Sequence, residues 1–323
     1  MKHIAGVRSP RITTIILLVG IAQAGCSPAE SEALEEDDPS KLFQLAFRYK
    51  VGDGVPLNLE KSAELCLQAA KLEHPGAQLV MGYIYREGDG VEQSYENALR
   101  WFEEASRNGL STARYELAML YLKGHGIEID HRKAAELLKP LAEGGRPEAQ
   151  LELGMLYVRG NGIETDLDKG FELVRKAANQ KLDSAQRELG ALYVEARGVT
   201  QDFDQAFLWT SRAAMQGDLV AISNLGSLYA MGQGVEVNYE EAVKYFRIAA
   251  KDGHPMAQVK LGNMYVLGLG VKTDYVEGLA WYKVAHEVPE AETMIEAMIS
   301  KMPPDDIAIA ETRASEISLS IKE

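Results

Sequence analysis

The stretch YREGDGV, residues 85–91, places two glycines and several charged side chains directly after an apolar run. Backbone N–H groups of a glycine-rich loop can converge on a phosphate, whereas Asp and Glu oxygens around a glycine turn suit calcium. Taken alone, the stretch therefore raises two hypotheses, a nucleotide site and a calcium site. Both would make it the centre of the protein's chemistry.

Other residues that could bind a metal show no supporting pattern. The chain has six histidines, at His3, His74, His125, His131, His254 and His286. None are paired at metal-ligand spacing; His125 and His131 flank one short segment but have no carboxylate or thiolate partner beside them. We expect neither a metal site nor a bound cofactor.

Candidate catalytic groups are equally sparse. A glutamate recurs at intervals of 36 residues, at Glu116, Glu152 and Glu188. If these residues lie on neighbouring packed helices, the helix axes are roughly 8–10 Å apart, which is too far for two carboxylates to share a proton. We expect this ladder to be a solvated face. The sequence contains neither a nucleophile elbow nor a Ser-x-x-Lys motif, so we expect no enzymatic activity.

The glycine loop is repeated along the chain. One of its glycines recurs every 36 residues, at Gly54, Gly90, Gly126, Gly162, Gly198, Gly234 and Gly270. A tyrosine recurs on the same interval, at Tyr49, Tyr85, Tyr121, Tyr157, Tyr193, Tyr229 and Tyr265. A single nucleotide or metal site does not need seven versions of itself, so the stretch is predicted to be one element of a structural repeat.

Each repeat unit is predicted to contain two helices, because its apolar and small residues fall at helical spacing. An N-cap residue type stands before the second helix in every unit, at Asn58, Ser94, Asp130, Asp166, Asp202, Asn238 and Asp274. A glycine ends the first helix in every unit but the fifth, which has Ala196. Small residues at one position of each helix, such as Gly154 and Gly170, predict a close crossing of the pair.

The pattern A-x-x-x-L-G-x-x-Y-x-x-G-x-G-V followed by an Asx-type cap, as in residues 257–271 and Asp274, resembles the Sel1-like repeat. This resemblance covers residues 40–288. It implies an all-α, right-handed αα-superhelical solenoid of seven 36-residue helix-turn-helix repeats, related to tetratricopeptide arrays. Residues 289–323 resemble the C-terminal helical cap that closes such arrays. The usual work of the family is to bind other proteins.

The N-terminal residues 1–25 have the form of a bacterial export signal, with three basic residues before a short apolar run. Ala24-Gly25-Cys26 resembles a lipoprotein box, which would place a lipid on Cys26, and Ser27 resembles lipoproteins sent to an outer membrane. Cleavage after Ala24, which would release a soluble periplasmic protein, is the alternative. Residues 26–39 are acidic and are predicted to be a solvated tether.

The net charge limits the kinds of partner that the chain can bind, and the two cysteines limit its disulfides. Without the three basic residues of the signal, 34 − 3 = 31 basic residues face 48 acidic ones, a net charge of −17. A phosphate backbone would be repelled, so we expect no nucleic-acid partner. Cys66 stands where other units have Phe102 or Leu138 and is predicted to be a core residue; if Cys26 is not lipidated, a disulfide between the two stays open.

The resemblance to tetratricopeptide arrays also indicates a binding surface, the concave face lined by the first helices. By register, this face would carry Leu79, Tyr83, Tyr115, Met119, Leu151, Met155 and Arg187. Exposed Tyr, Met and Arg are enriched in protein interfaces. The same residues could instead pack between neighbouring units, and the sequence leaves that alternative open.

The sequence therefore favours a non-catalytic scaffold in the bacterial cell envelope that binds a periplasmic or other envelope protein and is held to the membrane by a lipid. Two other roles stay open. The chain could be an immunity lipoprotein that neutralises a toxic lipase-type effector, since some Sel1-like lipoproteins have that role. It could also be a hydrolase, although the paired cysteines of the family members discussed as β-lactam hydrolases are missing.

Overall fold

The computed structural model describes residues 38–322, and the predicted export signal, Cys26 and nearly all of the acidic tether lie outside this range. The described residues form sixteen α-helices and no strands. The helices are α1 (Pro39–Val51), α2 (Leu59–Lys71), α3 (Pro75–Glu87), α4 (Tyr95–Arg107), α5 (Ser111–Lys123), α6 (His131–Glu143), α7 (Pro147–Arg159), α8 (Leu167–Asn179), α9 (Asp183–Glu195), α10 (Phe203–Met215), α11 (Leu219–Met231), α12 (Tyr239–Lys251), α13 (Pro255–Leu267), α14 (Tyr275–Val284), α15 (Pro289–Ile299) and α16 (Pro304–Lys322).

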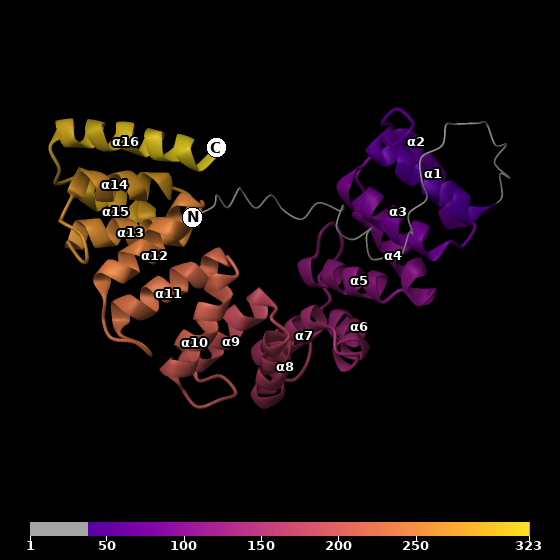
Figure 1. Ribbon diagram of the computed structural model, residues 1–323, viewed down its shortest axis with the longest axis horizontal. Helices are drawn as coiled ribbons and strands as arrows, with labels where there is room; N and C mark the ends of the chain where they lie inside the picture. Colours follow the sequence, from indigo (N-terminus) through magenta and orange to yellow (C-terminus); the bar gives the residue numbers. More distant parts are fainter. Residues whose placement is uncertain (1–37, 323) are drawn as a thin grey trace.

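The first fourteen helices form seven antiparallel hairpins that stack in chain order. Figure 1 shows them following one arc, from α1–α4 at one end, through α6–α9 at the bend, to α13–α16 at the other end. Each helix packs on the next along the chain, as expected of a solenoid built from one supersecondary unit. The predicted all-α solenoid of seven helix-turn-helix repeats is confirmed.

The glycine loop is a structural turn in every unit. In the YREGDGV stretch, Gly88 and Gly90 have φ angles of 78° and 75°, in the left-handed region that glycine adopts without a steric penalty. The N–H of Ser94 then donates to the carbonyl of Tyr85 at 2.8 Å, and each of the other six units makes the same bond. The Asp89 carboxylate is paired with Lys50 of the preceding unit at 2.9 Å, where it ties two units together.

The helix limits follow the predicted caps. The side chain at the N-cap of each second helix accepts a hydrogen bond from the backbone N–H three residues on, as Asp166 does from Lys169 at 3.0 Å. Two of the histidines are explained in the same way, because His74 and His254 cap α3 and α13 through Nδ1. Ala196, the fifth unit's substitute for glycine, is held at φ 56°.

The two helices of a unit cross where small residues meet, as predicted. A Cβ added to Gly154 would lie 2.9 Å from the carbonyl oxygen of Gly170, so any side chain there would push α7 and α8 apart. In units two, five, six and seven an aromatic or threonine side chain of the second helix, such as Phe246 against Gly226, covers the glycine. Units one and three have alanine at this position. The cost of glycine inside a helix, about 1 kcal/mol, is thus offset by close packing.

Neighbouring units are joined by buried amide hydrogen bonds as well as by apolar contacts. Gln150 donates to the carbonyl oxygen of Ala142 at 3.1 Å and accepts from Gln180 of the same unit's second helix at 2.9 Å. Equivalent donors stand at Gln78, Gln186 and Gln258. Because these side chains are buried and satisfied, each fixes where one hairpin meets the next.

The C-terminal residues cover the last hairpin. Helix α16 lies against α14 (Figure 1), where Ala314 and Ile317 join the core around Trp281. Arg313 adds a pair with Glu277 at 2.9 Å. The apolar end of the stack is thereby buried by a helix whose exposed side chains are mostly polar, with Ile309 and Leu319 as exceptions. Within residues 38–322, no helix has both the length and the apolar character needed to cross a membrane.

Candidate functional site

The seven residues predicted to line the concave face lie on α3, α5, α7 and α9, but they are not equally accessible. Leu79, Tyr83 and Leu151 are buried, with 7%, 2% and 7% of their surface exposed. For these three the predicted exposure is wrong, and the alternative of packing between units holds. Leu79 and Tyr83 belong to a core cluster with residues of α4 and α5, and Leu151 belongs to a cluster with residues of α8 and α9. Four predicted residues remain half-buried, at Tyr115, Met119, Met155 and Arg187.

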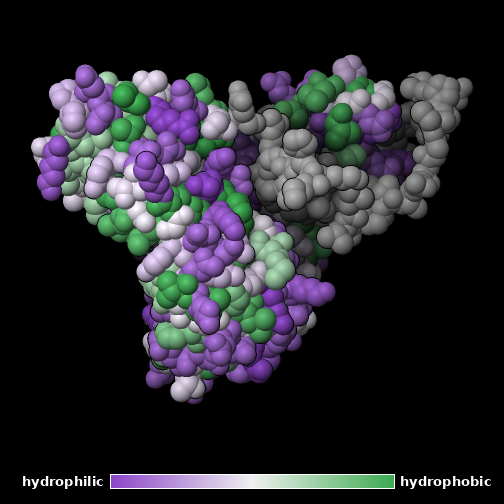
Figure 2. All heavy atoms as spheres, turned by 60° about the vertical axis from the view of Figure 1, so that its left-hand side comes forward, coloured by the Kyte–Doolittle hydropathy of each residue, from purple (hydrophilic) through white to green (hydrophobic). Residues whose placement is uncertain are grey.

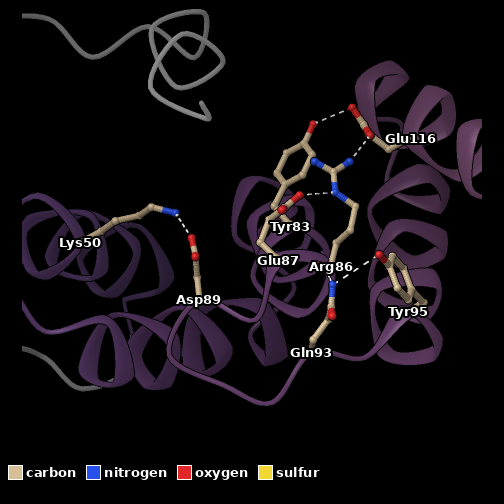
Figure 3. Close-up of polar contacts among 8 residues, drawn as sticks. All are labelled: Lys50, Tyr83, Arg86, Glu87, Asp89, Gln93, Tyr95 and Glu116. Carbon is tan, nitrogen blue, oxygen red and sulfur yellow. Dashed lines mark hydrogen bonds and ion pairs between the residues drawn. The ribbon is translucent and has the colours of Figure 1, made fainter. Parts of the chain in front are cut away.

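Tyr83 is the centre of a contact between units two and three (Figure 3). Its hydroxyl donates to Glu116 Oε1 at 3.0 Å, and its ring meets the edge of Phe102 at 5.4 Å between centroids. Arg86 lies over the same ring at 4.9 Å and pairs with Glu116 at 2.7 Å. Burial, followed by the negative charge of Glu116, raises the pKa of the Tyr83 hydroxyl. Tyr83 therefore holds units together and is not free to contact a partner.

Tyr115 and Arg187 are held in a similar way. The Arg146 guanidinium lies over the Tyr115 ring at 4.2 Å from its centroid. Arg187 pairs with Asp218 at the start of the next unit and with Glu188 at 3.1 Å. Both side chains thus present one face to solvent while the other face joins neighbouring helices. Met119 and Met155 have no such polar attachment and occupy the same register position on α5 and α7.

The carboxylate ladder differs from the predicted solvated face. Glu116 is 15% exposed and carries the Arg86 pair, and Glu188 is 26% exposed and pairs with Arg187. Burial raises the pKa of Glu152, although Lys123 and Arg159 act in the opposite direction. The ladder is half-buried because the inner side of the arc crowds these side chains. Glu116 thereby joins units two and three, whereas Glu188 pairs with Arg187 within α9.

The register position of the carboxylate ladder changes its charge in the later units, which the sequence prediction did not follow. The position holds Glu116, Glu152 and Glu188 in units three to five, then Asn224 and finally Lys260. Apolar side chains on the same face of α11 and α13 are exposed, at Val220 and Met256 one turn before this position and at Met231 and Leu267 two turns after it. The change from glutamate to asparagine and lysine can be seen in the sequence when this position is followed at 36-residue intervals into units six and seven.

The described residues offer little for catalysis or metal binding. Over residues 38–322, no three His, Cys, Asp or Glu side chains gather as a metal ion would require. Cys66 is buried, as predicted, and burial raises the pKa of its thiol to about 12. A thiol with that pKa is a poor nucleophile, since the thiolate is the reactive form.

The stacked hairpins and their repeated caps define an αα-solenoid repeat protein. A family model for the Sel1 repeat matches residues 42–74, 75–110, 111–145, 147–182, 183–218, 219–254 and 255–285. The chain belongs to the Sel1 repeat family, which confirms the resemblance found in the sequence. Sel1 repeat proteins are protein-interaction scaffolds, and their fold is generally non-catalytic.

The chain is also similar to solved structures. A Sel1 repeat protein from Oxalobacter formigenes is 28% identical, with 81% of this chain and 76% of that chain aligned at a TM-score of 0.68. Yeast Tom70, 15% identical over 83% of this chain and 56% of its own, shares the fold at a TM-score of 0.51. An immunity protein from Pseudomonas aeruginosa is 21% identical over 70% and 83% of the two chains, with a TM-score of 0.43. No curated protein matches the chain.

Proposed function

We propose that this chain is a non-catalytic scaffold of the bacterial cell envelope that binds a partner protein on the concave face of units two to five. The single observation that carries the proposal is the pair Met119 and Met155. These half-buried thioether side chains occupy equivalent places on successive first helices, and neither forms a hydrogen bond within residues 38–322, although Met155 packs against the core around Leu151. Methionine adapts its shape to a partner, which suits a binding surface.

Charged side chains one turn further along α5 and α7 support the same surface. Lys123 and Arg159 each follow a methionine by four residues, which places them on the same helix face. The resulting arrangement has an apolar centre and a charged edge. Protein interfaces are commonly built in this way, because the centre loses water on binding while the edge stays hydrated.

The test is a pull-down of envelope proteins by the full chain and by a Met119→Ser/Met155→Ser variant. The matched control is Met215→Ser/Met294→Ser, which changes two exposed methionines on α10 and α15. We expect one resident envelope protein to be captured by the wild type and the control but not by the first variant. Equal capture by all three, with circular dichroism melting curves unchanged, would rule out this surface.

Tyr83 is left out of this variant, since its side chain is buried and bonded to Glu116. Capture only after a secreted toxin is added, with no resident protein retained, would favour the immunity role. In that outcome the scaffold role is wrong even if the binding surface is right.

The envelope location is the second part of the proposal and is supported by the sequence of residues 1–26 alone. Labelling cells with a fatty-acid analogue should attach lipid to the wild-type chain and not to a Cys26→Ser variant, which should move from the membrane to the soluble periplasmic fraction. A wild-type chain that carries no label and stays soluble would instead indicate cleavage after Ala24.

A further inference from the structure

Lys260 on α13 has an unusual position for a cation. Its Nζ donates to Ser227 Oγ on α11 at 2.9 Å and lies 5.7 Å from the centroid of the Phe246 ring, and the side chain is half-buried. Burial lowers the pKa of the ammonium. It forms no ion pair with residues 38–322, although acidic residues outnumber basic ones by 48 to 34 in the whole chain. No described carboxylate pairs with this charge.

Two further hydrogen-bond donors lie on the same helices, each within one turn of Lys260 or Ser227. Asn263, one turn beyond Lys260, accepts from the Tyr282 hydroxyl through Oδ1, which leaves its Nδ2 without an acceptor among the described residues. Ser223, one turn before Ser227, is 1% exposed, and its hydroxyl has no partner there. A buried polar group without a partner is uncommon and costs free energy. Positive charge and unused donors are thus concentrated where α11 meets α13.

Exposed apolar side chains flank these polar groups on both helices. Met231 and Leu267 stand four residues after Ser227 and Asn263, and they are 67% and 64% exposed. Val220 and Met256 stand four residues before Asn224 and Lys260, and they are 39% and 37% exposed. Residues four apart lie on the same helix face. Along this face of each helix, polar side chains therefore lie between two exposed apolar ones.

We propose that the α11–α13 surface, formed by these apolar side chains with Lys260 and Asn263 between them, binds a partner peptide through an Asp or Glu carboxylate flanked by aliphatic side chains. The carboxylate would replace the hydration of Lys260 with a charge-assisted hydrogen bond. The aliphatic neighbours would cover Met231 and Leu267. This inference rests on the proposed scaffold function and assigns a peptide chemistry to a second part of the concave face.

Other ligand classes fit the surface less well. Lys260 and Asn263 separate the apolar side chains of this surface, so it offers no continuous apolar patch to a membrane. Figure 2 shows a similar mixture of hydrophobic and hydrophilic residues on the face that it displays. A phosphate is usually held by several cations or by a glycine-rich turn, whereas one ammonium and an amide suit a single carboxylate. Lys260 is the one cation at this register position in the seven units.

The test is to select a library of random short peptides on the immobilised full chain and to measure binding of the recovered peptides by fluorescence anisotropy. We expect enrichment of Asp or Glu next to Leu, Ile or Val. Lys260→Gln should weaken binding about tenfold or more, because it removes a partly desolvated charge. Lys260→Arg should keep most of the affinity, and Lys251→Gln, an exposed lysine on α12, is the matched control.

A second variant, Met231→Ser/Leu267→Ser, should also weaken binding, and because both side chains are exposed it should leave the melting temperature unchanged. The proposal is overturned if no peptide is enriched, if the enriched peptides lack carboxylates, or if Lys260→Gln binds them as tightly as the wild type. Loss of this site would leave capture of a protein through Met119 and Met155 intact, so failure here is distinguishable from failure of the scaffold function.

Discussion

The hydroxyl of Tyr83 donates to the carboxylate of Glu116 across 3.0 Å and so links the first helices of two consecutive repeat units. The same carboxylate accepts from Arg86 at 2.7 Å. One acidic side chain thus completes a contact to which α3 contributes an aromatic ring and a cation. Residues that a sequence comparison would assign to a binding groove are here used to set the angle between units.

Removing only this hydroxyl should weaken the contact without opening a cavity. Tyr83→Phe is expected to lower the free energy of unfolding by about 1 kcal/mol, because Glu116 keeps its Arg86 pair. Urea denaturation followed by circular dichroism measures the change. Tyr275→Phe is the control, since Tyr275 is 56% exposed and its hydroxyl should contribute nothing. Equal stability of the two variants would show that the hydroxyl does not join the units.

Ala196 offers a stabilising substitution. It is the C-cap of α9 and is held at φ 56°. In this left-handed region a Cβ destabilises the backbone by roughly 1–2 kcal/mol, and glycine has no such penalty. Glycine loses more conformational entropy on folding than alanine does, and this loss offsets part of the gain. Ala196→Gly should therefore raise the free energy of unfolding by about 0.5–1 kcal/mol. Ala308→Gly, at an exposed site inside α16, should lower it by about 1 kcal/mol. A loss of stability in both variants would contradict the left-handed cap.

Glu152 makes stability depend on pH in a defined direction. Burial raises the pKa of its carboxyl in the folded chain, so the charged form is disfavoured by folding and stability falls as the pH rises through that pKa. Glu152→Gln should therefore be more stable than the wild type at neutral pH. The advantage should disappear below the ordinary pKa of a glutamate, where both states are protonated.

Thermal melts of both chains between acidic and neutral pH test this expectation. Glu188→Gln is the control, because Glu188 pairs with Arg187 at 3.1 Å and its replacement removes that pair. The control should gain no stability at neutral pH. An advantage of Glu152→Gln that persists unchanged in acid would show that ionisation is not its cause.

Cys66 should be unreactive in the folded protein. With a thiol pKa of about 12, only about one part in ten thousand is thiolate at pH 8, and the side chain is buried as well. In a Cys26→Ser background, a thiol reagent should label almost no protein until guanidinium is added, after which one thiol per chain should react. Rapid labelling of the folded chain would place Cys66 at an accessible surface.

The sequence by itself determined the repeat length, the helix limits and the crossing of the two helices in each unit. These features depend on interactions within one unit, such as a cap three residues from its donor or a glycine opposite its partner helix. Seven copies repeat each signal, so the asparagine or aspartate at a cap and the glycine at a turn could be recognised with little knowledge of the neighbours. Even Ala196 could be identified as a departure from the pattern.

Only the tertiary structure decided which first-helix side chains are available to a partner. Accessibility depends on the distance and tilt between units, which no single repeat encodes. Tyr83 and Met119 share a register position, yet the first is buried against Phe102 and the second is half-buried. Whether a charge is paired also depends on the next unit, which is why Glu116 serves the fold while Lys260 has no anionic partner among the described residues.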